Sequence, residues 1–82
     1  MASPAKLTCD ELDRHIRISR RTAVGWRELL SALQPERTLR MVADEIEILD
    51  GLAIAWPERA DELATLMDQW QDLAEQLKAK AN

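Results

Sequence analysis

Residues 35–77 read PERTLRMVADEIEILDGLAIAWPERADELATLMDQWQDLAEQL, and two regular apolar stripes in this stretch decide the fold. In the first half, alternating steps of three and four residues separate Leu39, Val42, Ile46, Leu49 and Ala53. The second half repeats this spacing with Leu63, Leu66, Trp70, Leu73 and Leu77. Such a period is that of an α-helix with one buried face. The stretch therefore predicts two long amphipathic helices.

The prolines set the boundaries of these two helices. Pro35 suits the first position of a helix, and Glu36 suits the positive end of the helix dipole. Pro57 ends the first helix, because the residue before a proline avoids helical geometry, and it also begins the second. We expect helices over about 35–55 and 57–80, each about 30 Å long, joined tightly enough to form an antiparallel hairpin.

Shorter helices are expected before the hairpin, over residues 7–33, after a disordered tail at 1–6. Thr8 and Glu11 have the spacing of a capping box, and Leu7 and Leu12 that of a hydrophobic staple. We place a break after residue 16, and Ser19 is a candidate N-cap for a second helix. The predicted fold is all-α, with four helices in one domain over 7–82. A short N-terminal helix-turn-helix precedes the long antiparallel helical hairpin of residues 35–80.

Residues 7–26 resemble the helix-turn-helix of the MerR and excisionase type. The matching positions are Leu7, Thr8, Glu11, Leu12, Ile16, Ile18, Ser19, Thr22 and Trp26. The segment departs from that pattern at Asp13, where the family has Ala, and at Arg17, where the turn has Gly or Asn. The resemblance implies that the start of the second helix is presented to a groove of DNA.

Charge is distributed unevenly along the chain. The net charge is −4, yet residues 1–40 hold eight basic and five acidic side chains, and residues 41–82 hold three basic and ten acidic ones. A basic cluster suits phosphate or a guanine edge. We therefore expect nucleic acid to be contacted by Ser19, Arg20 and Arg21, supported by Arg14, Arg17 and Arg27. The alternative is that these arginines pair with neighbouring acids and form a solvated surface.

A further apolar stripe of the first hairpin helix, Met41, Ile48 and Leu52, lies beside the main one. The two short helices cannot cover a rod of about 30 Å completely. We therefore expect these three residues to form the interface of a two-fold homodimer.

Catalytic and metal chemistry find little support in the sequence. His15 is the only histidine, and with Cys9 it makes too few ligands for zinc. The acidic pairs Asp44-Glu45 and Asp61-Glu62 suit solvated helix faces, and the three tryptophans suit a core. We expect no enzyme activity, no cofactor, no metal and no small-molecule substrate. One cysteine, no signal peptide and no membrane-spanning stretch predict a cytoplasmic protein that does not enter a membrane.

Two functions remain open at this point. The first is a small DNA-binding regulator of bacterial or phage type, with the hairpin as the dimerising part; small terminase subunits have a similar layout. The second is a small acidic inhibitor or adaptor that occupies the surface of a partner protein. Anti-CRISPR proteins and anti-activators are similar to the chain in size and charge.

Overall fold

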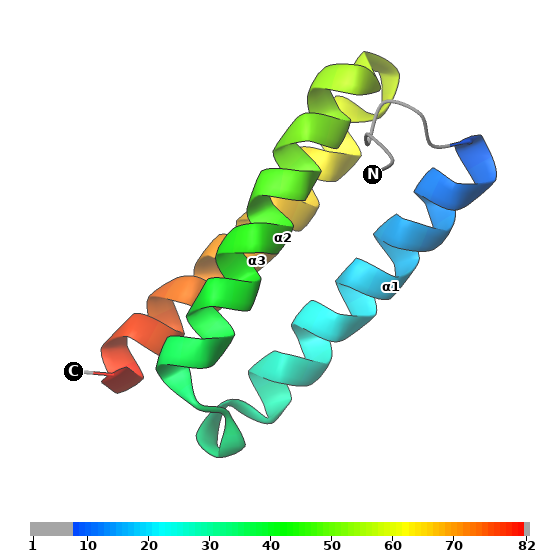
Figure 1. Ribbon diagram of the computed structural model, residues 1–82. Helices are drawn as coiled ribbons and strands as arrows, with labels where there is room; N and C mark the ends of the chain where they lie inside the picture. The colour runs from blue at the N-terminus through cyan, green and yellow to red at the C-terminus, as the bar shows by residue number, and fades with distance from the viewer. Residues whose placement is uncertain (1–7, 82) are drawn as a thin grey trace.

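The computed structural model describes residues 8–81, and within them every regular element is helical. Three α-helices, α1 (Cys9–Glu28), α2 (Pro35–Ala55) and α3 (Ala60–Ala81), are linked by the short 3-10 turns η2 (Leu30–Ala32) and η3 (Pro57–Arg59). Figure 1 shows α1 running alongside the pair formed by α2 and α3. The predicted all-α class is confirmed. The expected tail at 1–6 and Leu7 of the staple lie outside the described residues.

Helix α1 begins where the sequence predicts but does not stop there. Glu11 N donates to Thr8 Oγ1 at 3.1 Å, and Thr8 N donates to Glu11 Oε1 at 3.0 Å, which is the expected capping box. The helix then continues unbroken for 20 residues. The predicted break after residue 16 is wrong, and residues 8–81 form three α-helices rather than four.

The continuity of α1 has a local physical reason. Arg17 and Ile18 are ordinary helix residues, and no residue among 8–81 has a positive φ, so nothing there imposes a turn. The two departures from the helix-turn-helix pattern fit a straight helix. Arg17 is exposed, and Asp13 is an exposed residue whose Oδ1 lies 2.7 Å from Arg59 Nη2. Neither is wedged between helices.

The hairpin follows the proline boundaries closely. Pro35 occupies the first turn of α2, and the helix ends at Ala55, as predicted. Pro57 opens the one-turn η3 before α3 starts at Ala60, slightly later than expected. Helices α2 and α3 run side by side in opposite directions (Figure 1).

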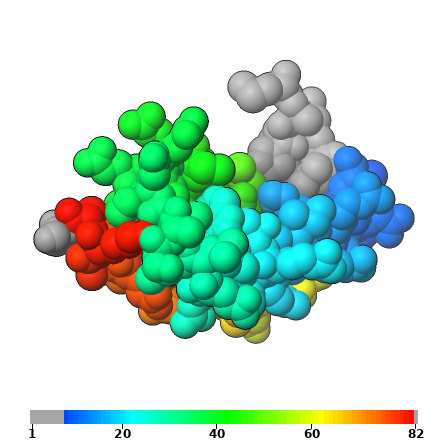
Figure 2. Space-filling model, turned by 90° about the horizontal axis from the view of Figure 1, so that it is seen from below, coloured from blue at the N-terminus to red at the C-terminus, as the bar shows by residue number. Residues whose placement is uncertain are grey.

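The C-terminal turn of α3 holds the α1–α2 connection in place. Lys80 Nζ donates to the carbonyl oxygens of Leu30 and Leu33, at 2.6 and 2.8 Å. Figure 2 views this end of the molecule and shows the end of α3 against η2 and the start of α2. The ammonium group supplies a donor to the Leu33 carbonyl and a second donor to the Leu30 carbonyl, which also accepts from Leu33 N.

The core lies where the three helices meet, and α1 packs mainly on α3. The core contains the whole predicted stripe of α3 and part of the predicted stripe of α2, and its members are Leu12, Ile16, Ala23, Val42, Leu49, Leu52, Leu63, Leu66, Trp70, Leu73 and Leu77. The other α2 stripe residues, Leu39, Ile46 and Ala53, are only partly buried and pack against this cluster. Trp26 and Trp56 pack against this cluster, so the expectation that the tryptophans anchor the core is confirmed. Leu52 is 0% exposed and belongs to the core cluster, which removes it from the expected dimer interface.

Candidate interaction surfaces of α1

The five arginines of α1 separate into two groups. Arg20 Nη2 lies 3.9 Å from Glu62 Oε1, and Arg27 Nη2 lies 3.1 Å from Asp72 Oδ2, so both face α3. The other three form no ion pair within residues 8–81 and are exposed; they are Arg14, Arg17 and Arg21.

The three unpaired arginines lie on one line along the helix. Positions 14, 17 and 21 are spaced so that they share a side of α1, opposite the buried positions 12, 16, 19 and 23. Seven residues of helix correspond to about 10 Å. A row of cationic side chains therefore points away from the core, whereas Arg20 and Arg27 pair with acidic side chains at the edge of α3.

Ser19, expected at a nucleic-acid surface, is not available there. It lies in the middle of α1 and is 4% exposed, so its predicted role as an N-cap is also wrong. Its hydroxyl donates to Glu45 Oε2 at 2.7 Å and accepts from Trp70 Nε1 at 2.8 Å. One side chain from each of the three helices meets at this hydroxyl.

His15 extends the same network. Its Nε2 lies 2.9 Å from Glu45 Oε2, and its side chain is 32% exposed. The hydrogen bond to the Glu45 carboxylate raises the pKa of His15, burial opposes this shift, and the charge of Glu45 adds to it. The pair therefore favours a protonated imidazole against the carboxylate.

This cluster does not have the geometry of a nucleophilic site. In a serine triad a histidine accepts the proton of the serine, whereas Ser19 donates to the carboxylate of Glu45 and His15 bonds to that carboxylate, not to Ser19. The Ser19 oxygen is also buried. The network instead satisfies polar groups at a three-helix junction, where the ring of Trp26 packs edge-on against Trp70 with centroids 5.4 Å apart.

Sequence reasoning missed Glu45, which it assigned to a solvated face. The signal was present in the spacing. Glu45 falls three residues after Val42 and four before Leu49, and both of these are buried. A carboxylate at a core position predicts a buried partner, and the chain supplies Ser19 and His15.

Large apolar side chains are exposed beside the arginines. Ile18 is 56% and Val24 47% exposed on α1, and Met41 is 51% exposed on α2. Ile18 and Met41 line a groove of about 270 Å³ between the two helices, with Ser19 and Glu45 also in its lining. Ile48, from the expected dimer interface, is 41% exposed, two turns further along α2 than Met41.

Other kinds of site leave little trace in the described part of the chain. No group of three potential metal ligands occurs within residues 8–81. None of the helices there combines the length and the apolar character that a membrane span requires. Cys9 is a free, exposed thiol at the first position of α1.

Comparison of the chain with protein-family models, with curated proteins and with solved structures finds no match.

Proposed function

We propose that this chain binds a partner protein through the exposed face of α1, defined as Arg14, Arg17, Ile18, Arg21 and Val24. The partner surface is acidic and carries an apolar centre, and the chain acts on it as a small inhibitor or adaptor. The observation that carries the proposal is the row of arginines that form no ion pair within residues 8–81, interspersed with aliphatic side chains that are about half exposed.

The mixture of side chains on this face favours a protein over other partners. Exposed apolar side chains gain stability when a partner removes them from water, and arginine is enriched at the centres of protein interfaces. Unpaired arginines attract carboxylates of a partner and steer its approach. Contact with a phosphate backbone would stabilise the arginines but would not bury Ile18 or Val24.

The arginines of this face are tested by charge reversal in the full chain. Arg17→Glu should weaken binding of the partner at least tenfold, because a central interface arginine contributes more than about 1.4 kcal/mol. Arg37→Glu is the matched control, since it makes the same charge change at an exposed position of α2. Equal retention of a co-purifying protein by both variants would contradict the assignment.

Nucleic-acid binding is a second candidate, favoured by the same three arginines. It no longer rests on a helix-turn-helix, because α1 is unbroken. If Arg14, Arg17 and Arg21 each contact a phosphate, affinity for a random-sequence duplex should fall with salt with a logarithmic slope of about −3. Fluorescence anisotropy near 50 mM salt measures this, and absence of binding there would reject the candidate.

A further inference from the structure

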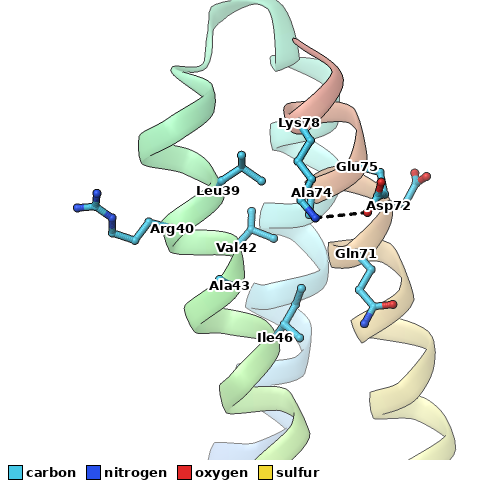
Figure 3. A pocket seen from close by; sticks show the side chains of 10 residues that line it. All are labelled: Leu39, Arg40, Val42, Ala43, Ile46, Gln71, Asp72, Ala74, Glu75 and Lys78. Atoms are coloured by element: carbon cyan, nitrogen blue, oxygen red, sulfur yellow. Dashed lines mark ion pairs between the residues drawn. The ribbon is translucent and has the colours of Figure 1, made fainter. Parts of the chain in front are cut away.

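An open groove runs between α2 and α3 on the side of the hairpin away from α1 (Figure 3). Its volume is about 650 Å³. The aliphatic part of the lining is Leu39, Val42, Ala43, Ile46 and Ala74. Lys78 and Glu75, 3.6 Å apart between Nζ and Oε1, stand on its α3 side. No element of residues 8–81 fills this groove, although α1 covers the opposite side of the same helix pair.

The edge of the groove on α2 carries charges of both signs in a definite order. Arg40 precedes Ala43 by three residues, and Glu47 follows it by four, so the three residues share one side of the helix. Arg40 and Glu47 are exposed and form no ion pair among the described residues. Ala43, which is small and exposed, lies between them.

We propose that a second copy of this chain occupies the groove, antiparallel to the first, about a two-fold axis near Ala43. Such an axis places Arg40 of each copy beside Glu47 of the other, so that two ion pairs form. Alanine at the axis lets the two α2 helices approach closely. A parallel arrangement would instead place arginine against arginine and glutamate against glutamate, which is unfavourable.

The size of the groove sets the strength of this dimer. The groove residues span positions 39–46 of α2 and 71–78 of α3, which is about 12 Å along each helix. The contact is therefore small, below the roughly 800 Å² per copy of a standard specific interface. The dimer should exchange with monomer at micromolar concentrations, and it leaves the exposed faces of α1 free on its two outer sides.

Sedimentation velocity over about 5–500 µM, at low salt, tests the arrangement. The wild-type chain should shift from monomer to dimer. Arg40→Glu should weaken the dimer at least tenfold, because it places a glutamate beside Glu47 of the other copy in both pairs. The double variant Arg40→Glu/Glu47→Arg should restore it, because both pairs re-form with reversed sign. Arg17→Glu, the matched control on α1, should have no effect, and circular dichroism checks that each variant folds.

Four outcomes would overturn the proposal. A wild-type chain that stays monomeric at about 500 µM excludes a dimer of useful strength. A dimer that tolerates Arg40→Glu uses another surface. A double variant that remains as weak as Arg40→Glu excludes the antiparallel pairing. A dimer that disappears equally with Arg17→Glu would place the contact on α1 instead.

Discussion

The hydroxyl group of Ser19 is the point at which the three helices are joined by polar contacts. It links α1 to Glu45 of α2 and to Trp70 of α3 by hydrogen bonds of 2.7 and 2.8 Å. Buried donors and acceptors without partners are costly, so each member of this group depends on the others.

Replacing Ser19 by alanine should therefore destabilise the whole fold. Ser19→Ala leaves the buried indole N–H of Trp70 without an acceptor and removes a donor from Glu45. We expect the free energy of unfolding to fall by about 1–3 kcal/mol in urea denaturation. Ser31→Ala, at an exposed position in η2, is the control and should change it by less than about 0.5 kcal/mol. A variant at Ser19 as stable as wild type would show that this network contributes nothing.

His15 should make stability depend on pH. Its pKa is raised in the folded state by the hydrogen bond to Glu45, so its stabilising contribution is complete below the pKa of the unfolded chain and is lost as pH rises through the folded value. The free energy of unfolding should be larger at pH 6 than at pH 8. His15→Gln should remove this difference, because the chain has no other histidine. An unchanged pH profile in that variant would assign the effect to another group.

At the scale of elements, the hairpin could be predicted and the unbroken α1 could not. Helices α2 and α3 have continuous apolar stripes and prolines at their boundaries, and both signals are local. Ser19 also has a local explanation, as an N-cap, and that explanation is wrong. Its partners Glu45 and Trp70 lie 26 and 51 residues away, so the hydrogen bonds that hold the buried serine are not visible in the local sequence.

The spacing of buried residues did contain a clue. Leu12, Ile16, Ser19 and Ala23 follow one another in steps of four, three and four, the period of a single helix. The surface was harder to predict, because the pairing of Arg20 and Arg27 with α3 depends on how the helices pack. The sequence identified the cluster of arginines, but not which of them remain unpaired.

Substitution of Arg17 separates a continuous α1 from a helix-turn-helix. In the middle of a helix, glycine costs about 1 kcal/mol relative to alanine. We therefore expect Arg17→Gly to be less stable than Arg17→Ala by about that amount. At a turn with positive φ the order would reverse, because glycine is favoured there. Thermal denaturation of the two variants, followed by far-ultraviolet circular dichroism, shows which of the two is less stable.

The whole molecule presents two different surfaces on opposite sides. On one side, α1 exposes unpaired arginines and aliphatic side chains; on the other, α2 and α3 leave an apolar groove. The network around Ser19 joins α1 to the hairpin, so the exposed face of α1 has a fixed position on the molecule. Rigid presentation lowers the entropy lost when a partner docks. The net charge of −4 makes the arginine row the exception on an acidic molecule.

The most direct test of this account is site-specific photo-crosslinking in the cells that produce the protein. A photoreactive phenylalanine derivative replaces Val24, on the exposed face of α1, or Asp68, an exposed position of α3, in the full chain. We predict one defined protein adduct from position 24 and none from position 68. The adduct should disappear with Arg17→Glu, and the purified partner should bind the wild-type chain. Adducts of equal yield at both positions, an adduct that survives Arg17→Glu, or an adduct to nucleic acid would contradict the proposed function.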